Sequence, residues 1–160
     1  MAGFAALGLR GRTITSKTVG AAGARNLLDG RSMNPKTAEL QQRTHNFFLR
    51  VIKLCEALPE SPAGRSISGQ LIDSAGGTDS NYRAACRARS TKEFVAKIGV
   101  AAEEADESKG WLQALLGANM ASRAELQALI QEADELVRIF TASAKTAKQN
   151  AAARGSRINN

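Results

Sequence analysis

The sequence predicts an all-α protein, an antiparallel up-down-up-down four-helix bundle with flexible basic tails. Four long segments carry apolar residues at spacings of three and four, which places those residues on one face of a helix. Only a few residues join the segments, so consecutive helices are expected to lie antiparallel. No segment shows the alternation of apolar and polar residues that is typical of a strand.

The chain of 160 residues is long enough for one domain with a single core. We expect a flexible N-terminal extension at 1–33, the four-helix bundle at 34–148 and a flexible basic C-terminal tail at 149–160. The extension is rich in glycine and has no sustained period, and we interpret it as lying ahead of a start at Met33. No apolar run approaches the roughly 20 residues that span a membrane, so we expect a cytoplasmic protein.

The first helix is predicted to begin at Asn34 and Pro35. Asparagine caps helix N-termini, and proline is favoured at the first helical position because its missing donor would go unpaired there. We expect Pro59 and Pro62 to end this helix, since proline does not continue one.

The second helix is predicted to start near Ser66 and to be irregular in its middle. Gly76 and Gly77 each cost about 1 kcal/mol relative to alanine in a helix interior. The three residues that follow, 78–80, have the side chains of a helix cap. We therefore expect a kink, or a break and restart, near 76–80.

Capping boxes mark the two remaining helices. Ser90 and Glu93 fit a box that opens the third helix, and the same pattern follows from Ser122 for the fourth. Gly117 is placed to close the third helix as a C-terminal cap. We expect the helicity of the fourth segment to fade after Lys148.

The net charge of +7 belongs to the two ends of the chain. Residues 1–32 hold five basic side chains and one acid, residues 145–160 hold four basic side chains and no acid, and residues 33–144 hold thirteen basic and fourteen acidic ones. The predicted bundle is thus nearly neutral, which weakens an argument from pI for a fold that binds nucleic acid.

Few side chains in the sequence are candidates for catalysis, metal binding or a disulfide. Cys55 and Cys86 form neither a disulfide framework nor a metal-ligand spacing, and we expect both to be reduced and buried or half-buried. His45 is the only histidine, and large Phe47 follows it closely where a phosphotransfer site needs a lysine and a small residue. We interpret His45 as a polar surface residue.

Four acids within 103–107 resemble a metal cluster but cannot all face inward on one helix. A di-iron bundle also needs two Glu-x-x-His motifs, and the chain has none. We therefore predict no metal site, no cofactor and no catalytic residues.

The best candidate for a binding site is a basic cluster of Arg83, Arg87, Arg89 and Lys92. Arg83 and Arg87 are four apart and share a helical face, and Tyr82 is a candidate for stacking on a base. One interpretation is a face that is solvated or forms ion pairs, within the chain or between subunits. The other is a site that binds the phosphates of a nucleic acid or another partner, with the basic tails adding affinity.

A resemblance to a known family starts from SNYRAACRARS at 80–90, followed by TKEFVAKIGVAAEEADESKGWLQALL. Together with RTHNFFLRVIKLCEALP and LIQEADELVRIFTASAKTAK, these segments resemble the bacterial four-helix bundle family of the 23S rRNA intervening-sequence protein type, over about 37–149. The matching positions are Asn81, Tyr82, Arg83, Arg87, Arg89, Ser90, Phe94, Glu104, Glu107, Trp111 and Leu112. The chain departs from the family pattern at Asp73 and at 76–78.

The resemblance implies a bundle that assembles into small rings, typically pentamers, without established catalytic activity. Related accessory variability determinants partner a reverse transcriptase and bind nucleic acid. Glu104, Glu107 and Trp111 are candidates for ion pairs or an interface with a neighbouring helix or subunit. We therefore expect a non-enzymatic, self-associating interaction protein. The alternative is a nucleic-acid-binding accessory factor that partners, for example, a reverse transcriptase or ribosomal RNA.

Overall fold

The computed structural model describes residues 34–158. This part of the chain forms four helices and no strand, namely α1 at Pro35–Glu56, α2 at Pro62–Cys86, α3 at Thr91–Gly117 and α4 at Arg123–Ile158. The predicted all-α class with four helices is confirmed. The predicted N-terminal extension at 1–33 lies outside the described residues.

The start of α1 is the one predicted. The side chain of Asn34 accepts a hydrogen bond from the Lys36 amide at 2.9 Å, and Pro35 is the first helical residue. The helix ends at Glu56, so Pro59 lies in the turn to α2.

The start of α2 is earlier than predicted. Ser61 caps the helix by accepting a hydrogen bond from the Gly64 amide at 3.0 Å, and Pro62 occupies the first helical position instead of ending α1. The expected start near Ser66 is therefore wrong. The helix then continues without interruption to its end, so the expected kink or break near 76–80 is also wrong.

Tertiary contacts explain why α2 stays continuous. Gly76 lies against the ring of Phe48, where an added methyl group would be 3.4 Å from ring atoms. Gly77 lies against Glu104, whose Cδ would be 2.7 Å from such a methyl group. The hydroxyl of Thr78 donates to the carbonyl four residues earlier at 2.9 Å, so this side chain bonds within the helix and does not cap a new one.

Both ends of α3 are closed by local hydrogen bonds. Ser90 Oγ accepts from the Glu93 amide at 3.1 Å as predicted, but the Glu93 carboxylate accepts from the Arg89 amide at 2.9 Å instead of that of Ser90. At the other end Gly117 is the last helical residue, and the left-handed residue is Asn119 with a φ of 53°. The amides of Asn119 and its successor return to carbonyls of the last turn, which is a Schellman motif. The expected Gly117 cap is wrong.

The last helix, α4, begins directly after Ser122, as predicted, and the Ser122 carbonyl accepts from the Leu126 amide at 3.0 Å. It continues well beyond Lys148, so the expectation that helicity fades there is wrong. Three consecutive alanines at 151–153 have the strongest intrinsic helix preference, and they carry the helix onward without an apolar face.

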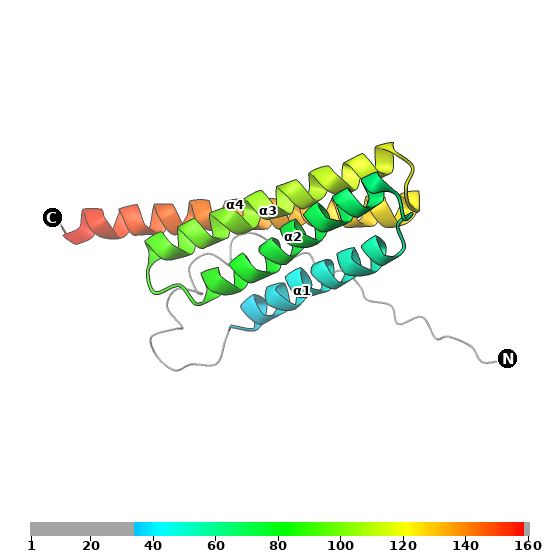
Figure 1. Ribbon diagram of the computed structural model, residues 1–160. Helices are drawn as coiled ribbons and strands as arrows, with labels where there is room; N and C mark the ends of the chain where they lie inside the picture. The colour runs from blue at the N-terminus through cyan, green and yellow to red at the C-terminus, as the bar shows by residue number, and fades with distance from the viewer. Residues whose placement is uncertain (1–33, 159–160) are drawn as a thin grey trace.

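Figure 1 shows the four helices lying alongside one another, with the turns at 57–61 and 118–122 at one end and the turn at 87–90 at the other. The C-terminal part of α4 reaches past the end that carries the turn 87–90 (Figure 1). α3 packs closely against both α2 and α4, whereas α1 packs mainly on α2 and only lightly on α4.

The core contains apolar side chains from every helix. The largest fully buried ones are Tyr82, Phe47, Phe140, Leu40, Leu54, Leu71, Ile98, Leu112, Leu115, Leu126, Leu129 and Leu136. Among the described helices, none combines the length and the apolar character that crossing a membrane requires.

Candidate functional site

Arg83 belongs to a polar cluster that joins α1 to α2. Its Nη2 atom lies 2.8 Å from Asp79 Oδ2, and its Nε donates to Asp79 Oδ1 at 3.2 Å. The same carboxylate accepts from Thr44 Oγ1 on α1 at 2.9 Å. His45 Nδ1 lies 3.3 Å from Asp79 Oδ2 and 3.0 Å from Arg83 Nη2. Three side chains thus surround one carboxylate.

The carboxylate of Asp79 explains why these groups gather. Asp79 is only 7% exposed, and a buried carboxylate is costly unless it is paired and hydrogen-bonded. Because arginine always donates, a neutral His45 accepts from Arg83 at Nδ1, whereas a protonated His45 donates to Asp79. The cluster therefore compensates a buried charge, and Arg83 is committed to it although 42% of its side chain is exposed.

Asp79 is not among the candidates that the sequence indicates, because residues 78–80 carry side chains that are typical of a helix cap. The signal that could have found it is the spacing of four between Asp79 and Arg83, which is that of an ion pair on a helix. His45 was interpreted as a surface histidine. It is only half-buried, but it is held by the cluster.

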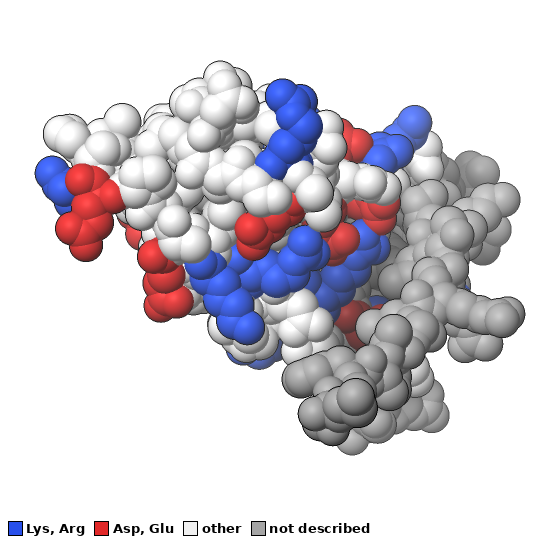
Figure 2. Space-filling model, turned by 90° about the vertical axis from the view of Figure 1, so that its right-hand side faces the viewer, with Lys and Arg blue, Asp and Glu red and all other residues white. Residues whose placement is uncertain are grey.

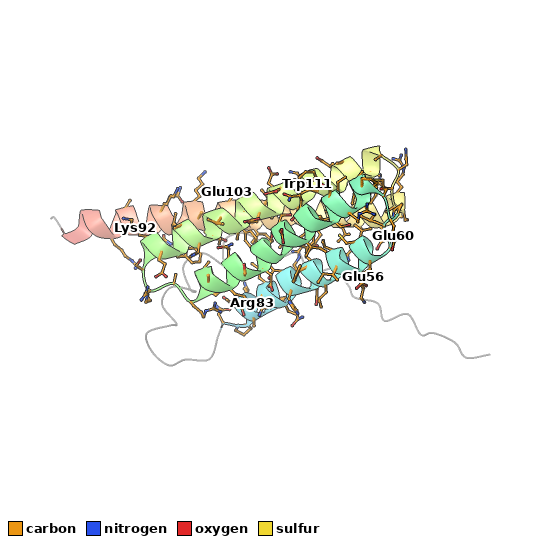
Figure 3. All side chains as sticks on the ribbon, viewed as in Figure 1. Glu56, Glu60, Arg83, Lys92, Glu103 and Trp111 are labelled. Atoms are coloured by element: carbon orange, nitrogen blue, oxygen red, sulfur yellow. The ribbon has the colours of Figure 1, made fainter. Side chains whose placement is uncertain are left out.

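The rest of the predicted cluster lies at the end of the bundle. Arg87 and Arg89 are exposed in the turn between α2 and α3, and Lys92 is exposed in the first turn of α3. Arg89 is 90% exposed and contacts Glu93. Figure 3 shows Lys92 near this end and Arg83 on the side of α2 that faces α1. The three exposed side chains are accessible to an anion in solution.

The same end carries basic residues from another helix. Lys145, Lys148 and Arg154 are exposed on the C-terminal part of α4, which lies at the end with the turn 87–90 (Figure 1). Figure 2 looks onto the opposite end and shows Lys and Arg side chains mixed with Asp and Glu. The folded chain therefore gathers basic side chains at one end, which we call the basic end and define as Arg87, Arg89, Lys92, Lys145, Lys148 and Arg154.

Tyr82 is not placed to stack on a base. Its side chain is only 1% exposed, and its ring stacks on Phe140 with centroids 5.1 Å apart. Burial, together with the neighbouring Cys86 thiol, raises the pKa of Tyr82 far above its usual range. The two cysteines are free and half-buried, and burial raises the pKa of Cys86 as well. Tyr82 is a core residue.

The acidic candidates lie farther along α3, on the side that Figure 3 marks with Glu103 and Trp111. Glu107 accepts a hydrogen bond from Trp111 Nε1 at 3.2 Å, and Trp111 is half-buried. Burial and the nearby carboxylates of Glu107, Glu103 and Asp73 raise the pKa of Glu104 above its ordinary value. Within residues 34–158 neither Glu104 nor Glu107 forms an ion pair with an arginine, and their role at an interface stays a prediction.

Two further charge clusters were not foreseen. Arg43 on α1 binds both Glu132 and Glu135 of α4, and these two carboxylates raise the pKa of the guanidinium above its usual range. Lys109 of α3 contacts Asp134 of α4 at 3.4 Å. Over the part of the chain that is described, no group of three or more histidine, cysteine or acidic side chains is arranged to hold a metal ion.

The fold and these residues can be compared with known proteins. The family model described as "23S rRNA-intervening sequence protein" matches residues 36–142, which is well over half of the chain. The chain belongs to this family. The match covers the predicted cluster, the buried Asp79 and the acidic residues of α3, and it stops short of the C-terminal part of α4.

A solved structure shares the fold of this family member. It is a protein of unknown function from the S23 ribosomal protein family of Bacteroides thetaiotaomicron, with a TM-score of 0.63 and 23% sequence identity. The similarity covers 69% of this chain and 98% of the other. No curated protein matches the sequence closely enough to be counted as a relative.

Proposed function

We propose that this protein is a non-enzymatic, self-associating interaction protein. Its helices form an up-down-up-down bundle with antiparallel neighbours, and copies assemble into a closed ring, a pentamer by resemblance to the family. Its place of action is the cytoplasm. The observation that carries this proposal is an outward face of α3 that is suited to a second helix.

This face, which we call the α3 seam, consists of exposed residues spaced alternately by four and three. Its members are Ala96, Val100, Glu103, Glu107, Gly110, Ala114 and Gly117. Such spacing is the heptad pattern along which two helices pack. A methyl group added at Gly110 or Gly117 would meet no atom within 4 Å, so another backbone can approach closely there. Val100 is one of two large apolar side chains that are exposed in residues 34–158.

Light scattering coupled to size exclusion tests self-association directly. We expect the full chain to elute as an oligomer at tens of micromolar, and a monomer at that concentration would contradict the proposal. Val100→Lys should dissociate the assembly, because it replaces an exposed apolar side chain on the seam with a long, positively charged one. Leu49→Lys is the matched control, since Leu49 is the other exposed large apolar residue of the described chain and lies on α1.

The basic end favours a second candidate function, that of a nucleic-acid-binding accessory factor that partners a reverse transcriptase or ribosomal RNA. Contacts there would be to phosphates, since Tyr82 is buried and no exposed aromatic ring is available on the described part of this end. Binding should then show little sequence preference and should weaken steeply with salt as counterions are released.

A titration with single-stranded RNA and DNA at two salt concentrations tests this candidate. Replacing Arg87, Arg89 and Lys92 together with glutamine should reduce affinity and flatten the salt dependence. The control replaces three exposed basic residues elsewhere, Lys53, Arg65 and Arg123. Equal affinity of both triple variants, or no binding by the full chain at low salt, would exclude the basic end as a nucleic-acid site.

A further inference from the structure

We propose that the C-terminal part of α4 from one copy docks on the acidic part of the α3 seam of a second copy. We call residues 145–158 of α4 the α4 extension. This inference rests on the proposed self-association and names the two surfaces that meet. Complementary charge and the small side chains on both surfaces support it.

The receiving surface carries negative charge that residues 34–158 do not neutralise by ion pairs. Glu103 and Glu107 lie on the seam. Glu104 lies close enough to both of them and to Asp73 for the negative charges to repel one another. None of these four carboxylates forms an ion pair with another residue of the described chain. Burial of Glu104 and the repulsion from the other three carboxylates raise the pKa of Glu104. A basic partner would relieve that repulsion.

The α4 extension has the opposite charge. Residues 145–158 contain four basic residues and no acid. Lys145, Lys148 and Arg154 are exposed, and no ion pair forms at any of them within 34–158. Two basic residues in the body of the bundle, Arg43 and Lys109, bind acids of α4 instead. The extension therefore offers cations that are available to another molecule.

The two surfaces also suit each other in shape and length. The extension exposes Ala151 between Lys148 and Arg154, which are spaced by three from it and lie along the same side of the helix, and the seam exposes Gly110 and Ala114 beyond its two glutamates. Small residues on both sides let helix backbones approach closely, which shortens the distance between the charges they carry. At 1.5 Å per residue, the seam from 103 to 114 and the extension from 145 to 154 are each about 15 Å long.

Two different surfaces of the chain meet in this contact. Because the two surfaces are different patches of one chain, their contact either closes a reciprocal dimer or propagates into a ring. In both arrangements each copy contributes its α4 extension to one contact and its α3 seam to another.

Sedimentation equilibrium on full-length charge-reversal variants tests the contact. The first variant carries Lys148→Glu and Arg154→Glu, the second carries Glu103→Lys and Glu107→Lys, and the third carries all four changes. We expect each two-residue variant to raise the dissociation constant of the assembly at least about tenfold, because like charges then face each other. The four-residue variant should recover assembly, since both surfaces are reversed.

The control reverses the same number of charges away from both surfaces. Arg65→Glu and Arg123→Glu lie in the first turns of α2 and α4, where glutamate suits the helix dipole, and they should leave assembly unchanged. Far-ultraviolet circular dichroism of every variant reports whether the bundle has folded.

The outcomes separate this inference from the proposed function. A monomeric full chain overturns both. An oligomer that is unaffected by reversal of Lys148 and Arg154 overturns the docking of the α4 extension and leaves self-association standing. If deletion of the basic segment 1–33 dissociates the assembly while the reversal does not, that segment is the occupant of the seam, and the assignment to the α4 extension is wrong.

Discussion

Asp79 is the residue on which the polar contacts between α1 and α2 converge. Its carboxylate accepts from Thr44 and Arg83, and His45 lies beside it. The hydroxyl of Thr44 is fully buried and also lies 2.9 Å from the Gln41 carbonyl, so it keeps an acceptor when the carboxylate is removed. The loss on removing Asp79 is therefore that of the hydrogen bonds to its charged carboxylate, and a hydrogen bond to a charged group contributes about 1.5–3 kcal/mol.

Asp79→Ala should therefore lower the free energy of unfolding by about 2–3 kcal/mol, as measured by urea denaturation. This loss is smaller than the loss expected on breaking a fully buried ion pair, because Arg83 keeps access to water. Asp73→Ala, an exposed acid on the same helix, should change stability by no more than about 0.5 kcal/mol. Equal effects of the two changes would show that the cluster contributes nothing to stability.

Glu104 makes stability depend on pH in the opposite direction from a paired acid. Its pKa is raised in the folded state, so the folded protein binds this proton more readily than the unfolded chain. The charged form therefore costs stability above the folded pKa, and this cost disappears below the ordinary glutamate pKa of about 4.3.

Glu104→Gln should accordingly raise the free energy of unfolding at pH 7 and have little effect near pH 4. Glu135 shows the reverse case, because its hydrogen bond to Arg43 lowers its pKa and stabilises the fold above the ordinary value. Glu60→Gln in the exposed turn serves as the control, and its effect on the free energy of unfolding should be the same at both pH values. A larger gain for Glu104→Gln at pH 4 than at pH 7 would contradict this assignment.

At the scale of elements, polar contacts reach α1 from both of its neighbours. It packs mainly on α2, and only lightly on α4. The Asp79 cluster links it to α2, and Arg43 with Glu132 and Glu135 links it to α4. Side chains that reach across from both neighbours thus hold the first helix in the bundle.

The continuity of α2 through its two glycines gives a direct test. Gly76→Ala should raise the free energy of unfolding by about 0.5–1 kcal/mol, because alanine reduces the entropy of the unfolded chain and its methyl group only touches Phe48. Gly77→Ala should gain less, since the carboxylate of Glu104 must move away. Thermal denaturation measures both, and a lower melting temperature for Gly76→Ala would argue for a break at this position.

At the scale of the whole molecule, the folding of the chain brings together basic segments that are far apart in the sequence. The turn between α2 and α3 and the C-terminal part of α4 lie at one end, so their basic residues gather there (Figure 1). The uncompensated carboxylates of α2 and α3 lie along the body of the bundle. A molecule with two such surfaces can associate with its own copies through complementary charge.

The fragment 34–148 should keep the fold. Residues 149–154 are largely exposed, so removing them takes little apolar surface out of the core. Its free energy of unfolding should lie within about 1 kcal/mol of the full-length value, when both are measured by urea denaturation at concentrations where both are monomeric. Failure of the fragment to fold would mean that the extension or the segment before α1 belongs to the core.

The sequence by itself determined the number of helices, the N-terminal caps of α1 and α3 and the apolar faces that fill the core. These features depend on residues within one or two turns of each other, through capping hydrogen bonds and a period of 3.6. Residues distant in sequence decided the rest. Phe48 and Glu104 lie over the glycines of α2, Thr44 and His45 reach the carboxylate that holds Arg83, and α4 brings its basic residues beside the turn that follows α2. Such contacts leave no periodic signal along the chain, because each depends on the register in which two helices meet.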